Sequence, residues 1–446
     1  MRNRIVLGVY MGLAGVFGMA GTAGPAAAQD LPAPFTDDDF LTVTEAEVAL
    51  GQLLFYDPIL SGNRNISCAT CHHPRFATGD GVSLGLGEGG KGLGPDRLPD
   101  PANMPEQLIP RNAPPLFNMG ARAVTVLFAD GRIEADPARP SGLRTPMEDE
   151  MVAGFANLLS AQTMFPVLSQ DEMAGHYQEN DVSQAVRQGF ITGENGAWDR
   201  IADRVAAIPA YAEMFHSAYP GTTRRGIAFT DLSNAIAAFV SAEWRADDSA
   251  FDRALRGEPL TGAAAEGQAL FFGEAGCSAC HSGALLSDMG YHATGAPQLG
   301  PGKGERFERH QKDIGRMRVT GRAADAYAFR TPPLRNVLQT GPWGHAGAHA
   351  DLRAFVDDHA AGGRALEHYA RAAILPAFEG AKPVWAVLDD PAQVEEIEAA
   401  VPAGRALAPE ELDALMAFLG SLTDEVALKG RLGVPDTVPS GLPVER

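Results

Sequence analysis

Apolar residues return every three or four positions in several segments of this 446-residue chain, which is the spacing of amphipathic helices. Thr44 and Glu47 are spaced as a capping box, which marks the start of one further helix. Strand signals are sparse, and residues 124–128 form the only good candidate. The pattern predicts a mainly α fold, with a helix after Thr44 and helices over residues 147–161, 198–207, 231–244 and 408–421.

The first 28 residues have the pattern of a secretory signal. Arg2 and Arg4 give a basic start, residues 5–20 are apolar, and residues 26–28 are alanines suited to cleavage. We therefore place the start of the mature protein near Gln29. No later stretch reaches about 18 uninterrupted apolar residues, so we expect no membrane span after cleavage. The signal favours export, most simply to a bacterial periplasm.

All four cysteines belong to two copies of a five-residue motif, Cys-x-x-Cys-His. The copies comprise Cys68, Cys71 and His72, and Cys277, Cys280 and His281. Two thiols at this spacing can form thioethers to one porphyrin, and the adjacent histidine then ligates the iron. A zinc site or two disulfides would use the same cysteines but would not explain a histidine after each pair. The motifs predict two covalent c-type haems with His72 and His281 as proximal ligands.

The segment before each motif is also repeated. Residues 51–55 read Gly-Gln-Leu-Leu-Phe and residues 267–271 read Gly-Gln-Ala-Leu-Phe, so an apolar helix and a loop precede both motifs. Between the copies, charged residues and a proline interrupt the helical pattern over residues 245–262. We therefore predict two cytochrome c-like haem domains with long loops, covering residues 29–250 and 251–446.

The iron of the first haem is expected to keep one face open. His73 is too close to His72 to reach the opposite face, and the next histidine along the chain is His176. Met104 and Met119 are the alternative sixth ligands, although their loop segments are more typical of packing. An open iron favours peroxide or dioxygen chemistry, whereas a filled one favours electron transfer.

Leu159 to Gln162, then Pro166, then Glu172 and Met173 form a further pattern, with Gln162 and Glu172 ten residues apart. This pattern resembles the distal stretch of the bacterial di-haem cytochrome c peroxidases and the related MauG enzymes. Similar segments follow the family's order at residues 111–114, 117–118, 128–132, 331–337 and 341–347. The resemblance implies that Glu172 is the general acid–base for peroxide cleavage and that Gln162 assists it by hydrogen bonding.

Two positions depart from the family pattern. Glu88 stands where some family members have a distal histidine, so inactivation of the resting enzyme by that histidine is not expected. Ala129 stands where the family has a tryptophan between the haems. Trp343 could replace that relay, and a packing role for Trp343 is equally open.

The resemblance also places the second ligand of the second haem. Counting from residues 334–337 puts His359 at that position, where the peroxidases have methionine and MauG has tyrosine. His345 and His349 are the alternatives. Two imidazoles would give this haem a lower potential than a histidine and a methionine.

A calcium ion between the domains is implied as well. The matching positions are the side chain of Asn112 and the main-chain oxygens of Thr340 and Pro342. Oxygen ligands of this kind suit Ca²⁺.

The net charge of −20 argues against nucleic-acid binding and is compatible with docking of a basic electron carrier. The leading hypothesis is a periplasmic peroxidase that reduces hydrogen peroxide with electrons from a small redox protein. The alternative is MauG-like oxidation of side chains on a partner protein, and a pure electron-transfer cytochrome is a third possibility. The sequence leaves the oligomeric state open, with a homodimer among the options.

Overall fold

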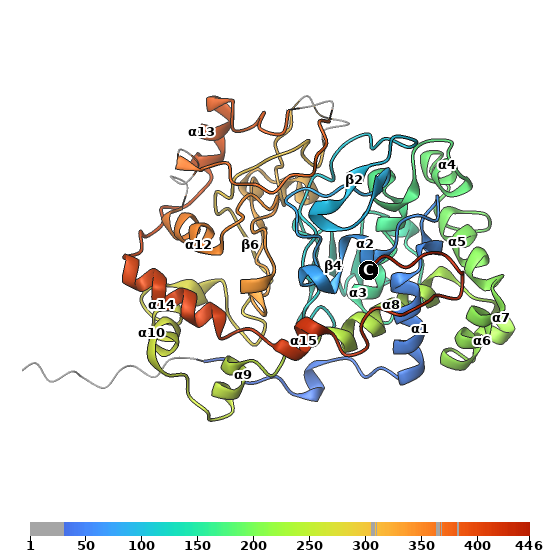
Figure 1. Ribbon diagram of the computed structural model, residues 1–446, viewed down its shortest axis with the longest axis horizontal. Helices are drawn as coiled ribbons and strands as arrows, with labels where there is room; N and C mark the ends of the chain where they lie inside the picture. Colours follow the sequence, from blue (N-terminus) through green and yellow to red (C-terminus); the bar gives the residue numbers. More distant parts are fainter. Residues whose placement is uncertain (1–30, 305–307, 309, 363–365, 367, 381–382) are drawn as a thin grey trace, which may run out of the picture.

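The computed structural model describes residues 31–304, 308, 310–362, 366, 368–380 and 383–446. Helices dominate and the strands are short, which confirms the predicted mainly α class (Figure 1). The predicted signal segment, residues 1–28, lies outside the described residues. Within the described ranges, no helix has the length and apolar character needed to cross a membrane.

The α-helices are α1 (Glu45–Tyr56), α2 (Cys68–Cys71), α3 (Leu158–Gln162), α4 (Asp181–Arg187), α5 (Ala197–Ala206), α6 (Pro209–Ala218), α7 (Thr222–Arg225), α8 (Phe229–Glu243), α9 (Ala250–Leu255), α10 (Gly262–Phe271), α11 (Met317–Thr320), α12 (Leu352–Ala361), α13 (Pro391–Ala399), α14 (Pro409–Gly420) and α15 (Glu425–Lys429). The strands are β1 (Gly90–Lys91), β2 (Leu98–Pro99), β3 (Val126–Leu127), β4 (Ile133–Ala135), β5 (Leu143–Arg144), β6 (Tyr291–His292) and β7 (Phe329–Arg330). All strand pairs are antiparallel: β1 with β2, β3 with β4, β4 with β5, and β6 with β7.

The helices predicted after Thr44 and over residues 198–207, 231–244 and 408–421 are confirmed as α1, α5, α8 and α14. The capping box is present, because Thr44 Oγ1 accepts from Glu47 N at 3.2 Å and the Glu47 carboxylate accepts from Thr44 N at 2.8 Å. The predicted strand is confirmed in shorter form as β3. Six further strands were not predicted, because a run of two or three residues is too short to show an alternating pattern.

The prediction of one helix over residues 147–161 is wrong. Glu148 has a φ of 47° and Gly154 a φ of 116°, and neither value belongs to a right-handed helix. The segment holds only a 3₁₀ turn at residues 148–150 and then α3, which Asn157 caps by accepting from Ser160 N at 2.8 Å. The apolar side chains that suggested a helix pack on the core from a loop.

One helix contact occurs in both halves of the molecule. A Cβ atom at Gly51 of α1 would lie 1.9 Å from the carbonyl oxygen of Ala235 in α8. A Cβ atom at Gly267 of α10 would lie 1.9 Å from the carbonyl oxygen of Ala414 in α14. Glycine is needed at both positions, because any side chain would push the paired helices apart. The repeated segment of the sequence therefore corresponds to a repeated pair of packed helices.

Two hydrophobic cores accompany the two helix pairs. The larger one, the N-terminal core, is built mainly from residues 35–246 and includes Leu54, Phe239 and Trp244. The second core includes Phe251, Phe271 and Phe418. In Figure 1 the blue and green elements lie on one side and most of the yellow and red elements on the other.

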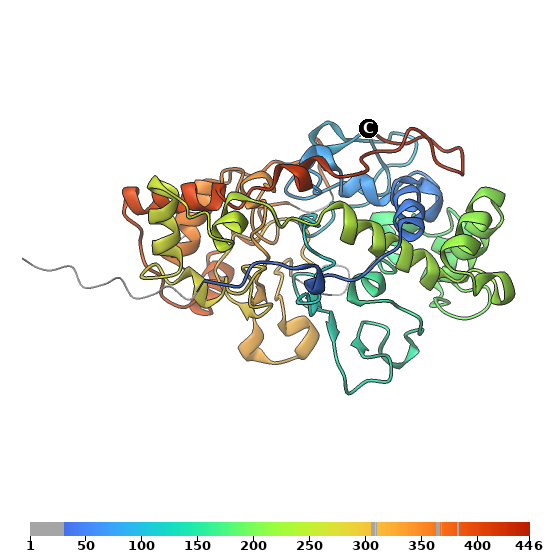
Figure 2. The ribbon, with the colours of Figure 1, turned by 90° about the horizontal axis from the view of Figure 1, so that it is seen from below.

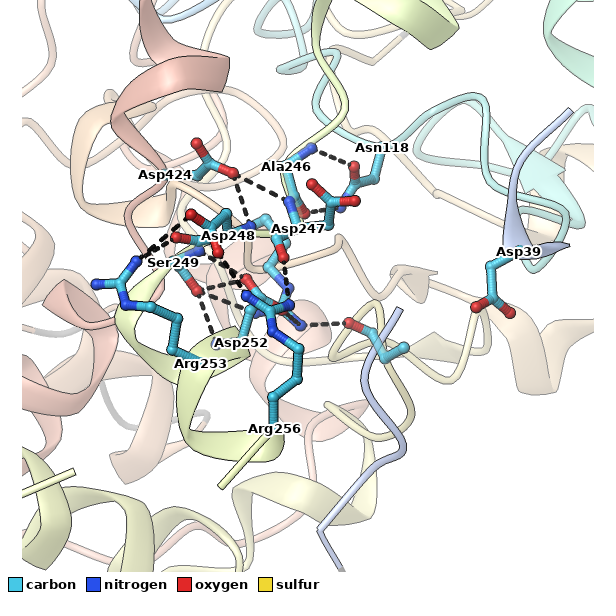
Figure 3. Close-up of polar contacts among 12 residues, drawn as sticks. Asp39, Asn118, Ala246, Asp247, Asp248, Ser249, Asp252, Arg253, Arg256 and Asp424 are labelled. Atoms are coloured by element: carbon cyan, nitrogen blue, oxygen red, sulfur yellow. Dashed lines mark hydrogen bonds and ion pairs between the residues drawn. The ribbon is translucent and has the colours of Figure 1, made fainter. Parts of the chain in front are cut away.

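Residues 245–249 join the two halves at the predicted junction (Figure 3). Ala246 N donates to Asn118 Oδ1 at 2.7 Å, and Asn118 Nδ2 donates to the Ala246 carbonyl oxygen at 2.8 Å. Asp424 Oδ2 accepts from the backbone N–H groups of Asp247 and Asp248, at 3.0 Å each. The junction is thus hydrogen-bonded by both halves.

The end of the chain returns to the N-terminal half, as Figures 1 and 2 both show. We call residues 431–446 the C-terminal strap. Val438 of the strap is buried in the N-terminal core, and Ser440 Oγ donates to Asp57 Oδ1 at 2.6 Å. Glu445 accepts a hydrogen bond from Thr70, inside the first Cys-x-x-Cys-His motif, and pairs with Arg97.

Candidate functional site

The first motif occupies α2 and continues to His72. The Nδ1 atom of His72 lies 2.9 Å from the carbonyl oxygen of Thr78. We assign the proton to Nδ1, which donates to this carbonyl; the backbone of Pro114 also lies within hydrogen-bonding reach of the ring. Burial lowers the pKa of His72, so the imidazole is held neutral. A neutral imidazole whose second nitrogen is fixed by a hydrogen bond is the form that ligates a metal.

The second motif repeats this arrangement. The Nδ1 atom of His281 lies 3.0 Å from the carbonyl oxygen of Leu286. Burial, together with the nearby imidazole of His359, lowers the pKa of His281 to about 4. In both motifs a backbone carbonyl fixes Nδ1, so Nε2 is the nitrogen that would ligate a metal.

His359 faces His281 from α12. The centroids of the two imidazole rings are 6.3 Å apart. Two imidazoles that bind one metal ion from opposite sides, each through a nitrogen at about 2 Å, have centroids about 6 Å apart. Phe355, one turn earlier in α12, stacks on His359 at 5.5 Å, and burial lowers the pKa of His359. The spacing fits a single metal held between the two rings.

The two alternative ligands are placed differently. His345 stacks on Phe329 with centroids 3.9 Å apart, and His349 Nε2 lies 2.7 Å from Asp358 Oδ2. In the described part of the chain, neither ring contacts the ring of His281.

Glu172 lies in the middle of a π-helical turn, η7 (Gln170–Ala174). Such turns are rare and are found disproportionately at functional sites. Burial and the charge of Arg132 together lower the pKa of Lys303 to about 8, although Glu172 acts in the opposite direction. Burial also raises the pKa of Cys71, and the charge of Glu172 contributes to that rise. Glu172 is therefore close to the first motif and to two partly buried cationic side chains, Arg132 and Lys303.

Gln162 is the last residue of α3, and a 3₁₀ turn, η6 (Pro166–Leu168), leads from it to η7. No hydrogen bond joins the side chains of Gln162 and Glu172 among the residues that the structure describes. The predicted pair thus lies on consecutive elements without a hydrogen bond between the two side chains.

Known proteins resemble this chain in sequence. The family model for di-haem cytochrome c peroxidases matches residues 45–259. The methylamine utilization protein MauG of Methylorubrum extorquens is 30% identical over 329 residues, which cover 72% of this chain and 70% of MauG. The chain belongs to the di-haem cytochrome c peroxidase family. Cytochrome c551 peroxidase of Pseudomonas aeruginosa is 28% identical over 70% of each chain.

Solved structures agree with this assignment. A MauG-like protein associated with microbial copper homeostasis has a TM-score of 0.55 and 25% identity, and the match covers 90% of this chain and 95% of that protein. The di-haem peroxidase BthA of Burkholderia thailandensis has a TM-score of 0.54 at 20% identity, covering 95% of this chain and all of BthA. At this identity, the similarity to BthA shows a shared fold and nothing more.

The residues present fit the two c-type haems that the family implies. Each motif combines two unbridged cysteines with a histidine whose Nδ1 is fixed by a backbone carbonyl, and His281 has a second imidazole at the separation that one metal requires. When bound, the haems would supply the iron that meets peroxide and the electrons that reduce it.

Ala129 stands at the position where the resemblance leads us to expect a tryptophan. The carbonyl oxygen of Ala129 accepts from Arg330 N at 2.8 Å. Trp343 packs against the second core, and its Nε1 donates to the carbonyl oxygen of Val337 at 2.9 Å. These contacts are those of a packing residue.

Several groups around Glu172 cannot be predicted from the sequence alone. Lys303 belongs to no motif, and the π-helical turn depends on contacts with distant segments. Glu88 stands out in the sequence only as a departure from the family pattern. In the structure Glu88 is 1% exposed, and its backbone N–H donates to the carbonyl oxygen of Asp171 at 2.9 Å.

Proposed function

We propose that this protein is a periplasmic di-haem peroxidase that reduces hydrogen peroxide at the His72 haem. Electrons would reach that haem through a second one, held by His281 and His359. The observation that carries the proposal is the asymmetry of the two motifs. His359 faces His281 at 6.3 Å, whereas no ring contact is found for His72 among the described residues, and Glu172 is one of the carboxylates near the first motif.

Glu172 has the chemistry that peroxide cleavage needs. Its carboxylate can accept the proton of the near peroxide oxygen and deliver it to the far oxygen, which then leaves as water. Arg132 and Lys303 place positive charge near this carboxylate. Gln162, at the end of α3, would orient the peroxide or the carboxylate by hydrogen bonding.

A second candidate is MauG-like oxidation of side chains on a partner protein. Two observations favour it: the identity with MauG, and a histidine rather than a methionine opposite His281. A bis-imidazole haem has a lower potential than one with a methionine ligand, which suits storage of an oxidising equivalent.

Electron paramagnetic resonance of the resting oxidised protein tests the asymmetry. We expect one high-spin haem and one low-spin haem, and we expect His359→Ala to remove the low-spin signal. Two low-spin signals in the parent protein would refute an open first haem. A low-spin signal that persists in His359→Ala would exclude His359 as a ligand, and His349→Ala provides the matched control.

Mixing with hydrogen peroxide separates the two candidate functions. A reaction that requires prior half-reduction and consumes electrons from a small redox protein supports the peroxidase. A spectral change of the fully oxidised protein, followed by oxidation of a partner protein, supports the MauG-like activity. No response to peroxide would leave an electron-transfer cytochrome.

We also propose a calcium ion between the two halves, held by the Asn112 side chain and the main-chain oxygens of Thr340 and Pro342. Asn112 lies where the halves meet, because its N–H donates to the carbonyl oxygen of His345 at 3.0 Å and its Nδ2 to that of Val82 at 2.7 Å. Exhaustive chelation should lower turnover without releasing the thioether-bound haems. Unchanged turnover would exclude the ion.

The domain division and the location are part of the proposal. The repeated helix pair and the two cores support domains at residues 29–250 and 251–446, with the strap of the second domain packed on the first. Export predicts a mature N-terminus near Gln29, which N-terminal sequencing of protein from a periplasmic extract would check.

A further inference from the structure

A buried polar cluster lies behind the turn that carries Glu172. Its centre is Glu88, whose Oε1 accepts from the side-chain amides of Asn63, Asn65 and Asn103 at 3.1, 2.8 and 2.8 Å. The side-chain oxygen of Asn103 lies 3.2 Å from His176 Nδ1. Asn103 thus connects a buried carboxyl group to an imidazole.

Two atoms of this cluster are buried without a partner. Within the described residues, Glu88 Oε2 and His176 Nε2 make no hydrogen bond, although both are shielded from solvent. Buried polar atoms are normally paired, because leaving one unpaired costs the free energy of its lost hydration. A carboxyl oxygen and an imidazole nitrogen that are both unpaired can each take up or release a proton.

The cluster holds the backbone of the Glu172 turn from several sides. The carbonyl oxygen of Asp171 accepts from Glu88 N at 2.9 Å, and that of Ala174 accepts from Asn180 Nδ2 at 3.0 Å. A Cβ atom built on Gly87 would lie 2.9 Å from Glu172 Cα, so the chain at residues 87–88 runs directly against the turn. Glu88 and Glu172 therefore lie on two segments in van der Waals contact.

The other end of the cluster reaches the surface. Glu179 Oε1 lies 3.1 Å from His176 Nδ1, and the Glu179 side chain is 27% exposed. Asn63 Nδ2 also donates to Glu179, at 2.6 Å. Among the described residues, Glu179 and His176 are linked to Glu88 through the amides, Glu172 lies on the neighbouring turn, and Arg97 donates to the carbonyl oxygens of residues 86 and 87 at 2.6 and 2.9 Å.

We propose that Glu88 and His176 form a proton-exchange pair that resupplies the peroxide site from the surface at Glu179. Reduction of one hydrogen peroxide to two waters consumes two electrons and two protons, so a closed site needs a proton inlet as well as an electron inlet. Glu172 only moves a proton from one peroxide oxygen to the other. The proposal rests on the proposed peroxidase function and adds the source of the two protons that accompany the electrons.

The substitution Glu88→Gln tests the pair. Glutamine keeps the oxygen that accepts from the three asparagine amides but cannot carry a proton. The first reaction with one equivalent of peroxide should stay within a few-fold of the parent, because it needs no proton from outside. Steady-state turnover should fall about 10²-fold, the lower end of what an acid–base group contributes, with a larger solvent deuterium isotope effect. His176→Gln should behave in the same way.

Glu243→Gln is the matched control, because Glu243 is also a buried carboxylate that accepts two backbone hydrogen bonds, from Leu432 and Gly433 at 2.7 and 2.8 Å. Its turnover should equal that of the parent. As a readout independent of activity, the infrared difference spectrum on reduction should contain a carboxyl band that is absent in Glu88→Gln and present in Glu243→Gln.

Three results would overturn the proposal. Unchanged turnover in Glu88→Gln would show that the proton takes another route. An equal loss in the first reaction and in turnover would show that Glu88 acts only by holding the turn. Identical infrared spectra of the parent and Glu88→Gln would show that the carboxyl group does not exchange a proton. An unchanged first reaction in Glu172→Gln would refute the proposed role of Glu172 in peroxide cleavage. That result is independent of the results for Glu88→Gln.

Discussion

At the scale of single residues, Glu172 is the side chain whose replacement should change the chemistry most. Glu172→Gln should slow the first reaction with peroxide by about 10²–10⁴-fold, the usual contribution of a general acid–base group. The spectra of both haems should stay as in the parent, because no predicted ligand is changed. Stopped-flow absorbance after mixing with peroxide measures the rate.

Glu148→Gln and Glu150→Gln are matched controls for this prediction, since both carboxylates belong to the exposed 3₁₀ turn at residues 148–150, upstream of α3. Their rates should stay within a few-fold of the parent. A similar small change in Glu172→Gln would mean that Glu172 is an ordinary loop carboxylate and that the acid lies elsewhere.

Asp80 provides a pH-dependent test of the same region. Burial raises the pKa of Asp80 to about 7, although backbone N–H groups and Arg97 act in the opposite direction. The carboxyl group of Asp80 therefore keeps its proton in the folded state up to about pH 7, whereas in the unfolded state it loses the proton near pH 4. The protonated group favours folding at low pH, and this contribution to stability is lost as the pH rises to about 7. Asp80→Asn should therefore raise the unfolding temperature more at pH 8 than at pH 4.

Circular dichroism melts at the two pH values measure this difference. Asp96→Asn, an exposed carboxylate in the same long loop, should change stability by no more than about 0.5 kcal/mol at either pH. An Asp80→Asn effect that is equal at pH 4 and pH 8 would contradict the raised pKa.

At the scale of elements, α9 connects the junction to the second core through a buried ion pair. Asp252 Oδ1 lies 2.9 Å from Arg335 Nη2, and both side chains are 0% exposed. Asp252→Ala would leave a buried guanidinium without its anion, and we expect a loss of about 3–5 kcal/mol in the free energy of unfolding. Denaturant titration measures this loss.

Asp248→Ala is the control, because Asp248 pairs with Arg253 and Arg256 at the surface and is 61% exposed. Its removal should cost no more than about 1 kcal/mol. The double variant Asp252→Ala/Arg335→Met should recover part of the stability, since neither charge is then buried alone. A double variant less stable than Asp252→Ala would contradict this account.

At the scale of the whole molecule, the C-terminal strap ties the last residues to the first motif. Deletion of residues 431–446 removes the buried Val438, the hydrogen bond from Ser440 to Asp57, and the contacts of Glu445. Burying one valine side chain alone contributes about 1.5–3 kcal/mol, so the N-terminal half should melt at a lower temperature.

Hydrogen exchange locates the effect of this deletion. Exchange should accelerate in α1 and α2, which the strap contacts through Gln52 and Thr70, and should be unchanged in α10 of the second core. Equal acceleration in α10 would show that the strap stabilises the whole molecule rather than its first half.

The sequence by itself determined the local features of this protein. The two Cys-x-x-Cys-His motifs, the capping box of α1 and the helices with strong apolar spacing depend on residues a few positions apart, so they can be read without knowing the fold. The position of His359 came from resemblance to the family, because nothing in its own segment distinguishes it from a surface histidine.

Only the tertiary structure decided how distant segments meet. The ring of His359 lies 6.3 Å from that of His281, across 78 residues of chain, and Glu88 lies against a turn more than 80 residues away. The same holds for residues 147–161, where a single helix was predicted but does not form. There the apolar side chains pack on the core from a loop, and Glu148 and Gly154 have positive φ values that a right-handed helix does not allow. Such contacts form only when the whole chain has packed, because the entropy of closing long loops is offset by burial throughout the core rather than by any local pattern.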